Sequence, residues 1–204
     1  KVTTESKVGI TKEFFSYSIV NAAGPWVNAF NNNISKENTS IHLVKGSHIV
    51  VKKMFEHKNS YFLLGQDGRI IFVIPFQEDF TLIGTTEKPH DDISREPTCS
   101  KEEKKYLIEF ANSYFNSNLD LENVVWSYSG VRSLYKNLTN NQGSMSSITR
   151  DYMLHVELIN ELPILTVYGG KLTTYRKLAE NVLFKMKSYF PKMGESWTSE
   201  EPLP

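Results

Sequence analysis

The chain has 204 residues, of which 40% are hydrophobic and 23% are charged, as is ordinary for a globular protein. Lys and Arg number 23, and Asp and Glu number 23, so the formal net charge is zero and no basic excess favours binding to nucleic acid. The longest apolar run, residues 70–76, is too short to span a bilayer, and the single cysteine excludes an intrachain disulfide.

The first predicted elements are a strand and a short helix within residues 14–30. Gly24 and Pro25 mark the turn between them, and proline is tolerated at the first turn of a helix because its missing N–H would have no partner there. A polar, Asn-rich loop follows at residues 31–40.

A dense group of short strands comes next. The runs at residues 47–51, 61–64, 69–76 and 80–86 are rich in β-branched and aromatic residues, and turn signals separate them. Short strands joined in this way predict an antiparallel meander rather than βαβ units.

A helix is predicted over about residues 101–115, because Ser100 and Glu103 have the spacing of a capping box. An apolar stripe at helical spacing indicates its buried face. The stripe consists of Tyr106, Leu107, Phe110, Ala111, Tyr114 and Phe115.

A second group of strands is predicted at residues 124–131, 147–156 and 163–169, with a polar loop at residues 133–146 between the first two. The last helix is predicted to begin near residue 173 or 174. Its apolar face is formed by Tyr175, Leu178, Val182 and Met186.

The sequence GGKLTT at residues 169–174 lies between the last strand and the last helix. A helix N-terminus offers unpaired N–H groups and a partial positive charge, the glycines let a ligand approach the backbone, and Lys171 adds a full charge. Thr173 or Thr174 is expected to cap the helix. The turn therefore suits an anionic group, and a plain strand-to-helix turn remains the alternative.

No complete nucleotide-binding signature accompanies this turn. Leu165 stands where a Walker A loop needs its first glycine, and Leu172 stands where it needs Ser or Thr. The dinucleotide fingerprint G-x-G-x-x-G is also absent from the sequence.

Two arginines and one histidine are the other candidate site residues. Arg132 shares a strand face with Trp126 and Tyr128, and a guanidinium binds phosphate or carboxylate through paired hydrogen bonds. Arg150 lies within a predicted strand, where an ion pair with the adjacent aspartate is the simplest alternative. His48 follows a Gly-Ser turn and is a candidate general base or a hydrogen-bonded structural residue. The remaining histidines lack ligand-like spacing, so no metal site is predicted.

Seven segments together resemble one family. They are VNAAGPWV, LVKGSHIVV, RIIFVIPF, LIGTT, VVWSYSGVRSL, ITRDY and GGKLTTYRKLAE. In their order and spacing the chain resembles the FAD-dependent, membrane-associated glycerol-3-phosphate dehydrogenases over almost its whole length.

The resemblance implies an α+β fold like that of D-amino-acid oxidase, in which an antiparallel substrate-binding sheet with flanking helices joins part of an FAD domain. Residues 1–30 are expected to be a strand and helix of the FAD domain, and residues 31–160 the antiparallel substrate-binding domain. Residues 161–190 are expected to return to the FAD domain, and residues 191–204 to link to a C-terminal domain. Because Lys1 replaces a start methionine, we expect a piece of a longer protein whose G-x-G-x-x-G unit lies upstream.

The resemblance also implies roles for individual residues. Arg132, Arg150 and Lys171 match positions that hold the substrate, and His48 matches a position beside the reacting carbon, where it would accept the 2-hydroxyl proton. His48, Arg132 and Lys171 are thus the expected catalytic residues. The expected FAD contacts fall in two segments, one at the flavin's pyrimidine edge (Gly170, Lys171, Leu172 and Thr173) and one at the ribose and pyrophosphate (Asn21, Ala22, Ala23, Gly24 and Trp26).

Two positions depart from the family pattern. Ala23 stands where the family commonly has threonine, which weakens one expected cofactor hydrogen bond, and Ser133 stands where it has proline, which loosens the loop after Arg132. Neither change removes a group that the reaction needs.

The implied activity is oxidation of sn-glycerol 3-phosphate to dihydroxyacetone phosphate, with hydride transfer to FAD and electrons passed to a quinone. The resemblance implies a cytoplasmic protein held peripherally on the inner face of the cell membrane, and a homodimer is one assembly that it allows. Alternatives are an oxidase that uses oxygen and a non-catalytic module that binds a phosphate ligand. We expect the 204-residue chain alone to be inactive, because half of each site would lie outside it.

Overall fold

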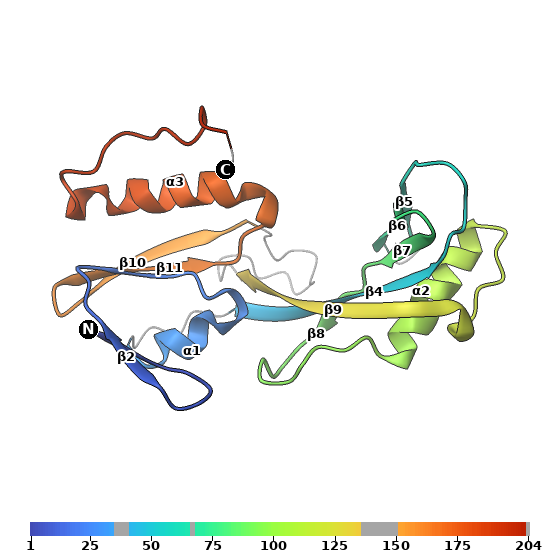
Figure 1. Ribbon diagram of the computed structural model, residues 1–204, viewed down its shortest axis with the longest axis horizontal. Coiled ribbons are helices and arrows are strands. Elements are labelled where there is room, and N and C mark those ends of the chain that lie inside the picture. Colours follow the sequence, from blue (N-terminus) through green and yellow to red (C-terminus); the bar gives the residue numbers. More distant parts are fainter. Residues whose placement is uncertain (35–40, 66–67, 136–150, 203–204) are drawn as a thin grey trace. The chain divides into compact units, whose positions relative to one another are not determined.

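The computed structural model describes residues 1–34, 41–65, 68–135 and 151–202. These residues form two compact units, one made of residues 1–41 with 134–204 and one made of residues 42–133. Figure 1 shows the elements of each unit, which are described separately below. The expected assignment of residues 31–160 to substrate binding and of the flanking segments to the FAD domain stays a prediction.

The unit of residues 42–133 is built on an antiparallel sheet whose strands differ in length. Its strands are β4 (Ile41–Lys52), β5 (Tyr61–Leu64), β6 (Ile70–Phe76), β7 (Phe80–Gly84) and β8 (Lys88–Pro89), in the order β5-β6-β7-β4-β8. The long strand β9 (Val124–Tyr135) also pairs with β4. The predicted antiparallel meander is therefore confirmed for β5, β6, β7 and β4.

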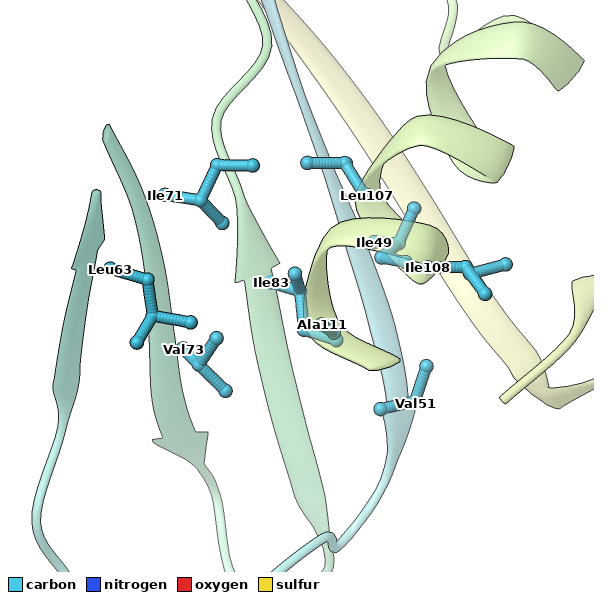
Figure 2. Packing of buried hydrophobic residues seen from close by; sticks show 9 residues of the cluster. All are labelled: Ile49, Val51, Leu63, Ile71, Val73, Ile83, Leu107, Ile108 and Ala111. Carbon is cyan, nitrogen blue, oxygen red and sulfur yellow. The ribbon is translucent and has the colours of Figure 1, made fainter. Parts of the chain in front are cut away.

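Helix α2 (Lys101–Tyr114) packs on one face of this sheet and closes the core of the unit. Figure 2 shows Leu107, Ile108 and Ala111 of α2 among side chains from β4, β5, β6 and β7. The predicted capping box is present, since Ser100 Oγ accepts from the N–H of Glu103 and the Glu103 carboxylate accepts from the N–H of Ser100. The predicted stripe is wrong in two places, because Ile108 is buried and Tyr114 is 51% exposed.

The other unit contains a three-stranded sheet, in which β10 (Met153–Ile159) and β3 (Ile19–Asn21) flank β11 (Leu162–Tyr168). β10 is antiparallel to β11, whereas β3 runs parallel to it. Residues 147–150 of the predicted strand 147–156 lie outside the described residues. The N-terminal residues form a hairpin of β1 (Val2–Glu5) and β2 (Thr11–Phe14), which the sequence patterns missed.

Helices cover both faces of the three-stranded sheet (Figure 1). On one face, Leu165 and Val167 of β11 pack against Val182 and Met186 of α3 (Tyr175–Met186). On the other face lies α1 (Val27–Asn31), which follows the short 3-10 helix η1 (Gly24–Trp26) with its proline in the first turn as predicted. The predicted apolar face of α3 fails only at its start, where Tyr175 is half-exposed.

The face of β11 next to α1 is tied down by a buried polar network. Asn31 Nδ2 donates to Tyr168 Oη at 2.8 Å, and Asn31 Oδ1 accepts from Asn21 Nδ2 at 2.8 Å. All three side chains are at most 5% exposed. The network therefore fixes α1 and the end of β3 to β11. None of the helices in the described part of the chain is both long and apolar enough to cross a membrane.

Candidate active site

Arg132 on β9 lies directly over the backbone of β4. A Cβ atom on Gly46 would stand 2.6 Å from Arg132 Nη2 and 2.6 Å from Thr85 Oγ1, so any side chain here would displace the guanidinium from this position. Arg132 Nη2 donates to Thr85 Oγ1 at 3.3 Å, and Nη1 lies 3.9 Å from Glu87 Oε1. The arginine side chain is still 39% exposed, and these two weak contacts leave its donors able to bind a further anion.

His48 lies on β4 two residues beyond Gly46, hence on the same face of the strand. Its ring stacks on Tyr128 of β9, with centroids 4.9 Å apart and planes 5° from parallel. The other side of the ring faces Gly84, where a Cβ atom would stand 2.1 Å from the imidazole Cδ2. The imidazole therefore occupies a slot between an aromatic ring and a strand backbone that has no side chain.

The electrostatics of this slot favour a neutral imidazole. Burial, together with the positive charge of Arg132, lowers the pKa of His48 below its ordinary value of 6.5. Its Nδ1 atom is buried and has no hydrogen-bond partner. At neutral pH the ring can accept a proton, and a fixed cation lies on the same surface. That combination suits a substrate that carries an anionic group and a hydroxyl to be deprotonated.

The sequence placed Arg132, Tyr128 and His48 on strands but did not bring them together. The structure does so through the pairing of β4 with β9, because all three residues lie within the unit of residues 42–133. Gly84 and Thr85 complete the site and were not predicted for it, whereas Gly46 was expected in a Gly-Ser turn and instead lies within β4. The only signal for the two glycines is that each interrupts a strand otherwise rich in large residues.

The other candidate residues gather at one edge of the three-stranded sheet. β3 and β11 are adjacent and parallel, with Asn21 paired to Thr166, so their carboxyl ends emerge side by side. β3 continues into Ala22, Ala23 and Gly24, and β11 continues into Gly169 and Gly170. Ligands of open α/β sheets bind at the carboxyl ends of parallel strands, so the two segments predicted to contact FAD share one edge.

The GGKLTT turn at this edge is open to solvent. Gly169 and Gly170 adopt φ of 74° and 108°, which side chains rarely allow, and Leu172 is 89% exposed. Lys171 and Thr173 are exposed as well. The expected threonine cap is wrong, because no side chain caps either the 3-10 helix η4 (Leu172–Thr174) or α3. Uncapped N–H groups remain at the turn and can meet an anionic or carbonyl oxygen.

The second segment at this edge divides into a fixed side chain and an open loop. Asn21 is buried, and its Nδ2 donates to two oxygens of α1 while its Oδ1 accepts from the N–H of Ala23. Its side chain therefore stabilises the fold. Ala22 and Ala23 are exposed, Gly24 has φ of 55° with open space where a Cβ would be, and Trp26 is 55% exposed. A ligand here would meet backbone and the indole of Trp26 rather than the Asn21 amide.

Two further predictions complete the account of the site. Arg150 lies outside the described residues, so its expected place beside the substrate stays a prediction. Among the residues described, no three His, Cys, Asp or Glu side chains come close enough together to hold a metal ion.

Comparison with known proteins identifies the family of this chain. Residues 1–176 match the model of the FAD-dependent oxidoreductase family. The chain is 40% identical over 204 residues to D-erythritol 1-phosphate dehydrogenase of Brucella abortus, covering 99% of this chain and 40% of that protein. It is 41% identical over 189 residues to aerobic glycerol-3-phosphate dehydrogenase of Escherichia coli K12, covering 91% of this chain and 37% of that protein. It thus spans about two fifths of the length of these curated relatives.

A solved structure shares the fold. The glycerol-3-phosphate dehydrogenase of Bacillus halodurans, solved in complex with FAD, superposes with a TM-score of 0.78 at 28% identity. The match covers 97% of this chain and 37% of that one. The α+β fold expected from the sequence is confirmed, and the chain belongs to the FAD-dependent oxidoreductase family.

Proposed function

We propose that this chain is part of a longer flavoenzyme that oxidises sn-glycerol 3-phosphate to dihydroxyacetone phosphate. The observation that carries the proposal is the strand face shared by Arg132 and His48, which presents a partly free guanidinium and a neutral imidazole. Glycerol 3-phosphate offers a phosphate to the first group and a secondary hydroxyl to the second.

In this proposal each residue acts on a named part of the substrate. Arg132 binds the phosphate, with Arg150 and Lys171 as further cationic ligands, and His48 accepts the proton of the 2-hydroxyl. FAD, when bound, supplies the acceptor for the hydride that leaves C2. The chain's part is to bind, to orient and to remove the proton.

The edge formed by β3 and β11 fits the cofactor. The exposed turn at Gly170 to Thr173 presents uncapped N–H groups and the Lys171 ammonium, which suit the electron-rich pyrimidine edge of a flavin. Ala22, Ala23, Gly24 and Trp26 lie at the adjacent strand end, with open backbone for the ribose and pyrophosphate. Electrons would then pass to a quinone, from a protein held at the inner face of the cell membrane and able to form a homodimer.

The test uses the full-length protein. Purified with FAD, it should reduce a dye acceptor with glycerol 3-phosphate and form dihydroxyacetone phosphate, and Arg132→Ala should raise KM about a hundredfold, as expected for loss of a charge-assisted contact. A quinone analogue should be reduced without formation of peroxide; peroxide in stoichiometric amounts would identify an oxidase instead. Arg95→Ala is the matched control, because Arg95 is an exposed arginine of the same unit that pairs with Asp92.

The 204-residue chain itself gives a second test. We expect it to be purified without bound FAD and without turnover. A yellow preparation that oxidises glycerol 3-phosphate would disprove this, and a full-length protein without a G-x-G-x-x-G segment upstream of Lys1 would favour a non-catalytic module that binds a phosphate ligand.

A longer polyol phosphate is the second candidate substrate. The relative from Brucella abortus is a D-erythritol 1-phosphate dehydrogenase and is 40% identical over 99% of this chain, about as similar as the glycerol-3-phosphate dehydrogenases. Both substrates present a phosphate and a secondary hydroxyl to the same two side chains. The ratio of kcat/KM for D-erythritol 1-phosphate and glycerol 3-phosphate, measured on the same preparation, decides between them.

A further inference from the structure

A buried, ionised carboxylate lies beneath the Arg132 and His48 surface. Glu103, at the start of α2, has a side chain only 2% exposed and accepts four hydrogen bonds. Oε2 accepts from Lys45 Nζ at 2.7 Å and from the Ser100 N–H at 3.0 Å. Oε1 accepts from Ser47 Oγ at 2.9 Å and from Thr86 Oγ1 at 2.7 Å.

Glu103 accepts hydrogen bonds from two of the three segments that build the site, and Ser47 links it to the third. Lys45 and Ser47 belong to β4, and Thr86 follows β7. Ser47 Oγ also lies 2.7 Å from Ser129 Oγ, which adds β9 to the network. We call these five residues, Lys45, Ser47, Thr86, Glu103 and Ser129, the Glu103 network.

On each segment, a residue of the Glu103 network is the direct sequence neighbour of a residue of the site. Ser47 precedes His48 on β4, and Ser129 follows Tyr128 on β9, whose ring stacks on His48. Neighbouring residues of a strand point to opposite faces, so the network holds one face while the site occupies the other.

The third segment reaches Arg132 through a short series of hydrogen bonds. Thr86 Oγ1 donates to Glu103, and Thr86 O accepts from Thr85 Oγ1 at 3.1 Å. Thr85 Oγ1 in turn accepts from Arg132 Nη2 at 3.3 Å. The direction of the arginine is thus connected to the buried carboxylate through two adjacent threonines.

Stability alone is a poor reason for such a network. Taking Glu103 and Lys45 out of water costs several kcal/mol per ion in typical proteins, and apolar residues of the same volume often stabilise a fold as well or better. Packing of α2 is already provided by Leu107, Ile108 and Ala111. A polar network of this kind fixes one arrangement of the three segments, and it thereby fixes the positions of the site residues that these segments carry.

We infer that the Glu103 network positions Arg132 and His48, so that its members are positioning residues for substrate binding and proton removal in the function proposed above. The network touches neither substrate nor cofactor. Its role is to hold the register and spacing of β4, β9 and the segment after β7 at the site.

The test compares two buried threonines in the full-length protein. Thr86→Val removes the hydroxyl that bonds Glu103 and the Ser47 N–H. Thr81→Val is the matched control. Thr81 is as buried as Thr86, at 1% exposure, but its hydroxyl accepts from the Met54 N–H and belongs to neither the Glu103 network nor the site. Thr86→Ser keeps the hydroxyl and is the rescue variant.

Two quantities are measured for each variant, with thermal stability recorded alongside. The first is KM and kcat for glycerol 3-phosphate. The second is the pKa of the His48 imidazole by NMR of histidine-labelled protein, with the resonance assigned by His48→Asn. The NMR measurement needs no turnover, so it still decides the inference if the wild-type protein fails to oxidise glycerol 3-phosphate and the proposed function falls.

We expect Thr86→Val to raise KM by between about tenfold and a hundredfold with a smaller change in kcat, as for a misplaced binding group. It should also move the His48 pKa toward its ordinary 6.5, and Thr86→Ser should restore both values. If only KM changes, the network positions Arg132. If only the pKa of His48 changes, the network positions His48. If Thr86→Val matches Thr81→Val in both quantities, the network is structural only and the inference is wrong. Should Thr86→Val not fold, Ser129→Ala replaces it with the same control and the same outcomes.

Discussion

The two units of the chain prepare their candidate sites to different degrees. In the unit of residues 42–133, Arg132 lies over Gly46 and His48 is held between Tyr128 and Gly84, so the reactive groups have fixed surroundings within the unit itself. In the other unit, the GGKLTT turn has exposed side chains and no side-chain cap. The first candidate site is enclosed by residues of its own unit, whereas the turn of the second is open to solvent.

The buried polar networks of the two units differ in the same way. Glu103 is ionised, since its hydrogen bonds outweigh burial, whereas Asn21, Asn31 and Tyr168 form a network without charge. A charged network makes the stability of its unit depend on pH, whereas a neutral network does not. The units should therefore respond differently to mutation and to acid, and four experiments test this.

The largest effect is expected from His48→Asn in the full-length protein. Loss of a general base typically costs between about a hundredfold and ten-thousandfold in rate, so kcat should fall by this amount with a smaller change in KM. Because burial and Arg132 lower the pKa of His48, the wild-type kcat/KM should be constant at neutral pH and fall only below pH 6.5. The variant should lose that acidic limb.

His42→Asn is the control for this experiment, since His42 is an exposed histidine on the same strand. It should leave the rate and the pH profile unchanged. An acidic limb that survives in His48→Asn would mean that another group accepts the proton.

The second effect is a loss of stability in acid that begins in the unit of residues 42–133. Burial alone would raise the pKa of Glu103, but hydrogen bonds from Lys45, Ser100, Thr86 and Ser47 lower it from 4.5 to about 2. The folded state thus binds this proton more weakly than the unfolded state. The stabilisation, about 3 kcal/mol, is complete above about pH 4.5 and disappears as the pH falls from 4.5 to about 2.

Amide hydrogen exchange measured by NMR between pH 5 and pH 2 checks this, because it reports each unit separately. Glu180 of α3 also has a pKa lowered to about 2, by hydrogen bonds from Ser196 and Thr198, but its side chain is 11% exposed against 2% for Glu103, so water and salt screen it more strongly. Protection should therefore be lost first in the unit that contains Glu103. Equal loss in both units, or the same pH dependence in Glu103→Gln, would contradict the assignment.

The third effect concerns the neutral network. Asn31→Ala leaves Tyr168 Oη and Asn21 Nδ2 without their partner inside the fold, at a cost of about 1–3 kcal/mol in the free energy of unfolding. The loss should be the same at pH 5 and pH 7, because the amide side chain that is removed carries no ionisable group. Urea denaturation at both pH values measures it. Asn33→Ala, which removes an exposed amide bonded to Ala29 O, should cost under about 0.5 kcal/mol.

The contrast between the units also explains what the sequence could predict. Local patterns placed the meander, the capping box at Ser100 and the helices α2 and α3, because turn residues and apolar spacing act over a few residues. The pairing of β3 with β11 joins residues more than 140 positions apart, and no local pattern specifies it. The same is true of the pairing of β4 with β9 that brings Arg132 to Gly46.

For the site, the types of residue were predictable and their surroundings were not. A histidine after a Gly-Ser pair and an arginine on an alternating strand were recognisable candidates, but the pair lies within β4 and forms no turn. The slot for His48 depends on the absence of a side chain at Gly84. The threonine cap failed because Lys171, not a threonine, precedes the first helical turn and the Thr174 hydroxyl bonds back to Lys171 O. Glu103 was visible only as a capping residue, since three of its four hydrogen bonds come from Lys45, Ser47 and Thr86, which are distant in the sequence.

The smallest effect tests how closely Arg132 is fitted to its place. Arg132→Lys keeps the charge but replaces a planar, forked donor with a single ammonium that cannot bond Thr85 and a phosphate in the same way. We expect KM for glycerol 3-phosphate to rise about tenfold with little change in kcat, well short of the loss in Arg132→Ala. Glycerol itself, which lacks the phosphate, should be a poor substrate for wild type and variant alike. If Arg132→Lys equals wild type with glycerol 3-phosphate, then the site recognises charge alone, and the close fit of the guanidinium over Gly46 serves the fold rather than the substrate.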